Sequence, residues 1–142
     1  MTVKRETKVL LSLLAHEIFQ RKLEIDASAV EWAEVLAEGD RHAVTALLYP
    51  GMRQLSDVPE DVLAKTRGAA ITASIASENM LKSQRDILEL LEAKRIPCAV
   101  LKGASVARFY PHPELRTPGD IDILTGEKDI EQAKECLTAA GF

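Results

Sequence analysis

Asp120 and Asp122 are the residues of this chain whose types and spacing best suit metal chemistry. In a β-strand, residues i and i+2 point to the same face, so the two carboxylates would stand side by side. Like charges this close repel each other unless a cation neutralises them, and Mg²⁺ commonly takes one or two carboxylates together with substrate phosphates. The pair predicts a Mg²⁺ site, with Mn²⁺ as the alternative metal. An exposed Asp-x-Asp that arose by chance and has no function is the competing interpretation.

The segment Lys102-Gly103-Ala104-Ser105 has the composition of a phosphate-binding turn. It joins a short apolar run to an expected helix, and the free N–H groups and dipole of a helix N-terminus favour anions. Gly103 lets the backbone approach an anion, the Ser105 hydroxyl can donate a hydrogen bond, and Lys102 can add positive charge. A plain tight turn is the alternative. Together with the aspartate pair, this turn predicts the two halves of a nucleoside triphosphate site.

The sequence resembles the uncharacterised nucleotidyltransferase family of the DNA polymerase β-like nucleotidyltransferase superfamily. The resemblance rests on residues 100–105, 109–111, 115–116 and 119–124, and residues 43–49 resemble a segment of the helical N-terminal region of such proteins. It implies a mixed central sheet and Mg²⁺-dependent transfer of a nucleoside monophosphate from a nucleoside triphosphate to an acceptor. Neither the nucleotide nor the acceptor follows from the sequence.

The resemblance also implies roles for individual residues. Gly103 and Ser105 would contact phosphates, and Asp120 and Asp122 would hold the metal and act in catalysis. Arg116 lies just before the carboxylates, where it either neutralises phosphate charge or anchors its loop by ion pairing.

Three departures from the family pattern bear on activity. Gly103-Ala104 stands where the superfamily usually has Gly-Ser or Gly-Gly, and the 16 residues between Gly103 and Asp120 exceed the usual separation. A further acidic residue, which the superfamily usually takes from a later strand, has no counterpart before the last residue, Phe142. The acidic residues of the final helix are better explained as a solvated polar face. We therefore expect the chain to be a fragment or truncated form that is inactive alone.

The first 95 residues are expected to form a helical region that supports this site. Hydrophobic periodicity predicts a helix over residues 5–22 and a second one starting at Ser28, where a capping-box spacing occurs, and ending at Gly39. A third helix is expected to begin with Asp40 as its N-cap and to end before Pro50. Trp32 is expected in the core rather than in a ligand site.

The fourth and longest helix is expected to begin near Pro59, which suits a first turn. Apolar and small residues then recur at spacings of three and four, which predicts an alanine-rich packing seam. Gly68 is expected to bend or break this helix. Plain core packing is the favoured role of the seam, and a coiled-coil dimer is the alternative.

The chain changes character near residue 96, where short β-type runs begin to alternate with helices. We expect a buried strand at 98–101, a short helix at 104–110, a stiff irregular loop at 111–119, a strand at 120–125 and a final helix at 127–140. The predicted fold class is α+β: an N-terminal helical bundle (1–95), then the first part of a nucleotidyltransferase-type mixed sheet (96–142). Two strands alone are marginally stable, so self-association through the sheet edge or the long helix is expected.

The composition narrows the partners and the compartment. A net charge of −4 disfavours a protein that tracks nucleic-acid phosphates, although a local basic site could override this. Cys98 and Cys136 lie far apart in apolar contexts, which favours free buried thiols over a zinc site. A signal peptide and a membrane span are not expected, because His16 and Glu17 interrupt the first apolar run. The predicted localisation is cytoplasmic.

Two main hypotheses for the function remain open. The first is metal-dependent nucleotidyl transfer, incomplete in these 142 residues. The second is a catalytically inactive nucleotide-binding or protein-interaction module, suggested by the missing third carboxylate. An RNA-modifying nucleotidyltransferase of a toxin–antitoxin pair is a third, and the acidic composition disfavours it.

Overall fold

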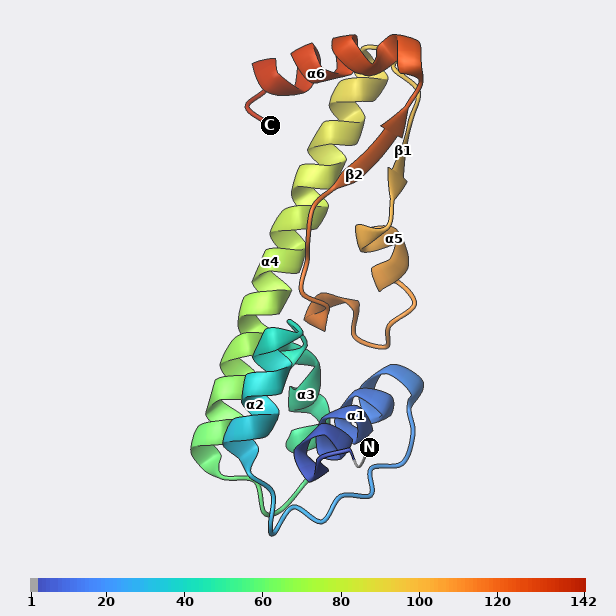
Figure 1. Ribbon diagram of the computed structural model, residues 1–142. Helices are drawn as coiled ribbons and strands as arrows, with labels where there is room; N and C mark the ends of the chain where they lie inside the picture. Colours follow the sequence, from blue (N-terminus) through green and yellow to red (C-terminus); the bar gives the residue numbers. More distant parts are fainter. Residues whose placement is uncertain (1–2) are drawn as a thin grey trace.

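One long helix, α4 (Glu60–Ala93), runs through most of the molecule in the computed structural model, which describes residues 3–142 (Figure 1). The other elements, in chain order, are α1 (Arg5–Phe19), α2 (Trp32–Arg41), α3 (Thr45–Met52), β1 (Cys98–Leu101), α5 (Gly103–Ala107), η1 (Pro113–Leu115), β2 (Asp122–Thr125), η2 (Glu127–Asp129) and α6 (Ile130–Ala139). Helices α1–α3 gather at one end of α4, and the hairpin of β1 and β2 with α6 lies toward the other (Figure 1). The fold is α+β with the helices first, as the sequence predicted.

The long helix α4 starts where the sequence predicted. Pro59 is its N-cap, and Glu60 and Asp61 occupy the first turn, where carboxylates complement the helix dipole. The expected bend or break at Gly68 was wrong, because the helix continues through this residue. Burial of one helix face outweighs the cost of an internal glycine, about 1 kcal/mol. Although α4 has 34 residues, no helix within residues 3–142 is both long and apolar enough to cross a membrane.

The largest core joins α1, α2 and α3 to the N-terminal end of α4. Leu13, Leu48 and Met52 are completely buried in it, and Val62 contributes from α4. Trp32 is 6% exposed within the same core, which confirms its predicted place. Because three helices share this core with α4, that end of the long helix has a partner along most of its apolar face.

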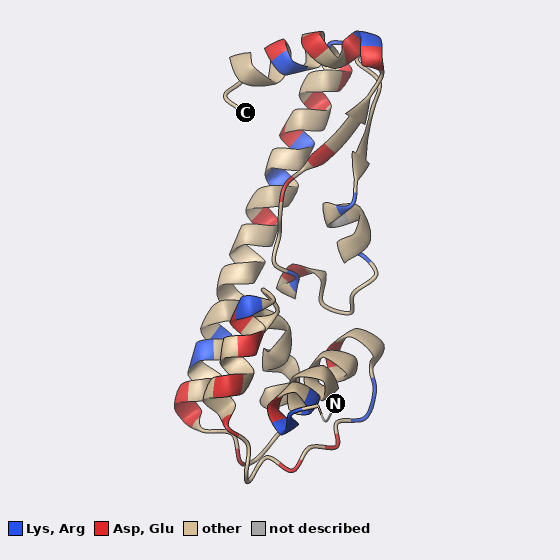
Figure 2. Ribbon diagram, in the orientation of Figure 1, with Lys and Arg blue, Asp and Glu red and all other residues tan. Residues whose placement is uncertain are grey.

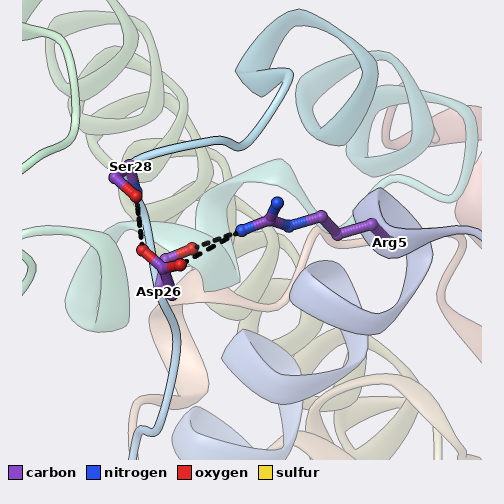
Figure 3. Close-up of polar contacts among 3 residues, drawn as sticks. All are labelled: Arg5, Asp26 and Ser28. Atoms are coloured by element: carbon purple, nitrogen blue, oxygen red, sulfur yellow. Dashed lines mark hydrogen bonds and ion pairs between the residues drawn. The ribbon is translucent and has the colours of Figure 1, made fainter.

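The predicted capping box at Ser28 was wrong. Helix α2 begins only at Trp32, and its N-cap, Glu31, makes no side-chain capping hydrogen bond. Ser28 instead donates to the Asp26 carboxylate from its hydroxyl (2.6 Å) and its backbone N–H (3.1 Å), while Arg5 of α1 pairs with the same carboxylate at 3.5 Å (Figure 3). The hydrogen bonds from Ser28 are the main cause that lowers the pKa of Asp26. The Ser28 side chain therefore bonds to the Asp26 carboxylate instead of capping the helix.

The predicted helix ends around Gly39 and Pro50 were also wrong. Gly39 lies inside α2, and a Cβ there would meet Thr45 Oγ1 at 3.0 Å, so this glycine allows α2 and α3 to approach closely. Asp40 is not an N-cap but accepts a hydrogen bond from Thr45 Oγ1 (2.6 Å), which is the main cause that lowers the pKa of Asp40. Pro50 lies inside α3, where burial of the neighbouring Leu47 and Leu48 offsets one lost helical hydrogen bond.

Helix α1 is shorter than predicted, because it ends at Phe19 rather than at residue 22. Gln20 adopts a left-handed conformation (φ 53°), and its backbone N–H donates to the Ala15 carbonyl. The Arg21 N–H reaches the same carbonyl at 3.4 Å. This arrangement is a common helix C-terminus, here formed without glycine.

The hairpin of β1 and β2 is antiparallel, with Leu101 opposite Asp122 and Cys98 opposite Thr125. A small core fastens one face of it to α4 and α6: its buried members are Ile87, Leu91, Ile96 and Ala133, with Cys98, Ile121, Ile123 and Leu137 packed against them. The other face is open, so the expectation of a buried first strand was wrong: Leu101 is 41% exposed and Leu124 is 56% exposed. Only two strands cover this core among residues 3–142, which leaves the outer face without a layer.

Three boundaries after residue 96 differ from the prediction. Helix α5 starts at Gly103 and ends at Ala107 rather than Tyr110, and β2 starts at Asp122 rather than Asp120. The final helical segment is split into a 3₁₀ turn, η2, and α6. The changes at α5 and at the final helix are small. The later start of β2 matters more, because it leaves Asp120 outside the strand.

The loop between α5 and β2 crosses back to the helical bundle. Leu115, at the end of η1, is buried against Ala46 and Leu47 of α3 and Ala70 and Ala73 of α4. Thr117 Oγ1 donates to the Ala43 carbonyl at 2.8 Å, across 74 positions of sequence. The helical region thus holds the loop that leads to the aspartates. The predicted division of the chain into a helical region (1–95) and a sheet region (96–142) stays a prediction. Helix α4 and this loop connect the two regions.

Glu17 of α1 is a buried carboxyl at the contact between α1 and η1. It is 5% exposed, and its Oε1 atom has no hydrogen-bond partner among residues 3–142. Burial raises its pKa above the ordinary value, an effect that nearby Glu114 strengthens and that His112 and His16 oppose. Glu17 therefore binds its proton more tightly in the folded protein than in the unfolded chain. The stabilisation that this proton brings is complete below the ordinary pKa and is lost as the pH rises through the folded-state pKa.

Replacing Glu17 by glutamine is therefore expected to stabilise the protein at neutral and higher pH. The gain should be about 1–3 kcal/mol, because the neutral amide removes the cost of burying a charged carboxylate. It should shrink toward zero at low pH, where the wild-type carboxyl is protonated. Urea unfolding of both proteins at about pH 4 and about pH 8 measures the difference. A glutamine variant that is less stable than wild type at the higher pH would contradict the prediction.

Candidate functional site

The predicted phosphate-binding turn begins where β1 ends. Lys102 has φ 53° and ψ −139°, and Gly103 follows with φ 49° as the first residue of α5. Two successive positive φ angles turn the chain sharply out of the strand, and only glycine adopts them without steric cost. The Ser105 backbone N–H donates to the Lys102 carbonyl at 2.9 Å and closes the turn. Ser105 is exposed, so its hydroxyl is the group that it offers to a ligand.

This turn lies against the backbone of Asp120. A Cβ built on Gly103 would meet the Asp120 carbonyl oxygen at 3.8 Å, an ordinary van der Waals distance. Glycine is therefore required here by its φ angle rather than by lack of space. The antiparallel pairing of β1 with β2 produces the contact, because it sets the end of one strand beside the start of the other. Although 16 residues lie between Gly103 and Asp120 in the sequence, the two residues are neighbours in space.

Asp122 carries the direct side-chain link between the two motifs. Its Oδ2 lies 3.3 Å from Lys102 Nζ, in a pair whose side chains are 43% and 75% exposed respectively. Figure 2 shows that acidic stretches of ribbon lead into β2, whereas the ribbon just before α5 is basic. An exposed pair of this kind contributes about 0–1 kcal/mol. Lys102 can therefore leave Asp122 at little cost when another cation or an anion arrives.

Asp120 is placed differently from the sequence expectation. It precedes β2 and is exposed, so the strand alternation that predicted two carboxylates on one face applies only to Asp122. Ile121 and Ile123 do pack against the small core of α4 and α6, as predicted. Asp122, which lies between them, faces away from that core. The Asp120 backbone lies beside Gly103, and Asp120 has no partner in the pairing of β1 with β2.

Arg116 is partly buried beside the loop and lines a cavity together with Arg108. It forms no ion pair within residues 3–142, so the predicted anchoring of the loop by ion pairing finds no support. Hydrophobic burial of Leu115 and the Thr117 hydrogen bond hold the loop instead. The guanidinium of Arg116 therefore has no acidic partner within residues 3–142.

The acidic set at this site has two members. Within residues 3–142, no three His, Cys, Asp or Glu side chains gather closely enough to hold a metal ion by themselves. Two carboxylates leave several positions of a six-coordinate Mg²⁺ for phosphate oxygens and water, which is the usual way that proteins hold Mg²⁺ on a nucleotide. The donor set fits a metal that arrives with a nucleotide better than a metal bound permanently by protein side chains.

A comparison of the sequence with known protein families supports the same function class as the residues of this site. Residues 28–142 match the family described as "Uncharacterised nucleotidyltransferase". The chain belongs to this family. The predicted resemblance is thereby confirmed, and nucleotidyl transfer is the class of reaction that family membership supports. Neither the curated proteins nor the solved structures that were compared gave a match.

The family match covers all of the site described above and excludes α1. Membership of a nucleotidyltransferase family supports a nucleotide as the substrate, but it says nothing of single residues. The roles of individual residues rest on the geometry instead. Helix α1, with its buried Glu17, lies outside the matched segment.

Sequence reasoning missed two residues of this region. Thr117 fixes the loop through the Ala43 carbonyl, and Arg108 joins Arg116 at one cavity. Neither gives a local signal, because a threonine after an arginine and an arginine at a helix end are both common. The resemblance of residues 43–49 to family members was the one available hint that this helical segment contacts the motif loop.

Proposed function

We propose that the chain binds a nucleoside triphosphate with Mg²⁺ between the start of α5 and the start of β2, and that it serves nucleotidyl transfer. The observation that carries this proposal is the meeting of the two motifs. Gly103 lies against Asp120, and Lys102 contacts Asp122 at 3.3 Å. A phosphate-binding turn beside a carboxylate pair has the chemistry of a metal–triphosphate site.

Asp120 and Asp122 are the proposed metal ligands and catalytic carboxylates. Mg²⁺, or Mn²⁺ as its alternative, would neutralise negative charge on the phosphates and orient the leaving pyrophosphate. The chain's own contribution is to bring Asp122 and the backbone of Asp120 beside the turn that begins α5. Asp122 is fixed by its strand, whereas Asp120 is positioned by the contact of its backbone with Gly103.

Lys102, Gly103 and Ser105 are the proposed contacts of the nucleotide phosphates, whereas Arg116, predicted from the sequence for the same role, lines a separate cavity with Arg108. Lys102 is paired with Asp122 without a ligand, so we propose that it exchanges partners when the nucleotide binds. Asp122 would then be free to hold a metal ion, and the Lys102 ammonium group would donate to a phosphate oxygen. The exchange is inexpensive, because an exposed ion pair contributes about 0–1 kcal/mol.

The partners follow from charge and exposure. A net charge of −4 favours a small acceptor over nucleic acid.

Cys98 and Cys136 are unpaired thiols, which fits a reducing compartment, and we propose a cytoplasmic location on that ground. Self-association through the open hairpin face or α4 remains a prediction, motivated by the exposed Leu101 and Leu124.

A second candidate function is nucleotide binding without transfer, as part of an interaction module. Two carboxylates beside a phosphate-binding turn are sufficient for binding a metal–nucleotide, which is all that this function requires. Both functions need the same metal–triphosphate site. They differ only in whether the α-phosphate is attacked.

Paramagnetic Mn²⁺ can test where the nucleotide binds. In NMR spectra of the ¹⁵N-labelled chain, addition of Mn²⁺–ATP at a small fraction of the protein concentration is expected to broaden the amide signals of residues 103–105 and 120–122 first. The physical reason is that an unpaired electron relaxes only nearby nuclei. Signals of α1, at the other end of the molecule, serve as the internal control. Broadening centred elsewhere, or none at all, would overturn the proposal.

A further inference from the structure

A cavity of about 210 Å³ lies between α4, the end of α5 and the proline-rich loop. Two arginines from different elements line it, Arg108 just after α5 and Arg116 just after η1. Its walls are otherwise mostly apolar and include Met80 and Leu81 of α4 and Pro118 of the loop. It therefore combines two permanent positive charges with a hydrophobic lining.

The charge of this cavity is uncompensated by the protein. None of the lining residues is acidic, and neither arginine forms an ion pair with Asp or Glu within residues 3–142. Arg108 rests on the Phe109 ring, with its guanidinium carbon 4.9 Å from the ring centroid. Stacking on an aromatic face holds a guanidinium plane and leaves its N–H groups at the edge available for an anion.

Size and lining define the ligand. Pockets for drug-sized molecules are commonly about 300–1,000 Å³, so a cavity of 210 Å³ accepts a small group rather than a whole nucleotide. A free phosphate or the tail of a triphosphate would gain nothing from the methionine, leucine and proline walls. The lining instead suits an anionic group attached to a small apolar body.

The cavity is also separate from the proposed phosphate-binding turn. Gly103 begins α5 and Arg108 follows its last residue, Ala107, so the two positions are separated by the length of the helix, roughly 7–8 Å at 1.5 Å per residue. A second anionic group, distinct from the phosphate at the turn, explains why positive charge is placed at both ends of α5.

We propose that Arg108 and Arg116 bind the carboxylate or phosphate of the acceptor substrate, and that the apolar walls hold the small body to which this group is attached. This inference rests on the proposed function, because an acceptor has meaning only beside a nucleotide site. Arg116 thereby changes from a contact of the nucleotide phosphates to a contact of the acceptor. Both arginines can bind an oxyanion in bidentate geometry.

Isothermal titration of the full chain with benzoate, phenyl phosphate and inorganic phosphate, without nucleotide or metal, tests the cavity. Wild type is expected to bind benzoate or phenyl phosphate at least about tenfold more tightly than inorganic phosphate, because only the first two fill the apolar part. Tighter binding of benzoate indicates a carboxylate acceptor, and tighter binding of phenyl phosphate indicates a phosphorylated one. No binding of either, or equal binding of inorganic phosphate, overturns the proposal.

Variants assign the binding to the two arginines. The double variant R108Q/R116Q is expected to lose at least about tenfold in affinity for the tighter aromatic anion. The control K82Q/R85Q removes the same charge from exposed positions of α4 outside the cavity and should bind like wild type. The single variant R108Q changes only an exposed side chain, so it retains the fold and should still weaken binding. Wild-type affinity in R108Q/R116Q overturns the assignment.

A final comparison separates this inference from the proposed function. D120N/D122N is expected to bind the aromatic anion like wild type, even where it loses Mg²⁺–ATP. Wild type saturated with Mg²⁺–ATP should still bind the aromatic anion. Competition between the two ligands would show that the cavity belongs to the nucleotide, and would overturn the acceptor assignment while leaving the nucleotide site intact.

Discussion

Replacing both Asp120 and Asp122 by asparagine is expected to lower the affinity for Mg²⁺–ATP at least about 100-fold. Each carboxylate attracts a divalent cation by about 2 kcal/mol at 4 Å even in bulk water, so the pair contributes about 4 kcal/mol. A loss of 2.8 kcal/mol already corresponds to a factor of about 100. Isothermal titration of Mg²⁺–ATP into both proteins measures the difference.

Two controls make this result specific. The variant E89Q/E92Q removes the same charge from exposed positions of α4 and should bind Mg²⁺–ATP like wild type. Titration with ATP in the presence of a chelator should reduce the difference between wild type and D120N/D122N to a few-fold, because the carboxylates act through the metal. Equal affinities of wild type and D120N/D122N for Mg²⁺–ATP would argue against both aspartates as metal ligands.

Replacing Leu91 by alanine is expected to cost about 2–5 kcal/mol of the free energy of unfolding. Leu91 is completely buried in the small core that joins α4, α6 and the hairpin, where Ile87 and Ile96 are its neighbours. Few other residues hold this end of the molecule together, so the cavity left by the leucine has little chance to be refilled. Urea unfolding followed by circular dichroism measures the loss.

The effect should extend to the site, because this core fastens the strands that carry Lys102 and Asp122. Amide hydrogen exchange in β1 and β2 is expected to accelerate in Leu91→Ala more than exchange in α1. Ile71→Ala is the matched control on the same helix: Ile71 is 56% exposed, so its loss should change stability by no more than about 0.5 kcal/mol. A Leu91→Ala variant as stable as this control would contradict the prediction.

Much of the fold was predictable, because burial and element type leave periodic patterns in the sequence. Helix α4, the core position of Trp32 and strand β1 follow from such patterns and agree with the structure. The errors arose where a side chain had two competing partners. Ser28 suits an N-cap, but the Asp26 carboxylate accepts its hydrogen bonds instead. Gly39 suits a helix end, but it serves the close approach of α3.

Some parts of the candidate site could be predicted from local sequence, and others depend on the fold. Gly103, Ser105 and the aspartate pair could be proposed from local sequence, since phosphate-binding turns and carboxylate pairs are short patterns. The pairing of Lys102 with Asp122 depends on the strand register, which no local pattern specifies. The cavity at Arg108 depends on how the end of α5 and the following loop lie relative to α4, and therefore required the three-dimensional structure.

The hydrogen bond from Thr117 to the Ala43 carbonyl has a consequence for the order of folding. It joins residues 74 positions apart, and closing so long a loop is entropically costly until other contacts have already brought its ends together. The contacts among α1–α3 and the start of α4 are more local, so we expect the helical end to form first and to act as the template on which the loop docks. Asp120, which follows this loop, would then reach its place beside Gly103 among the last events. Destabilising the helical end should slow maturation of the site even when no residue of the site has changed.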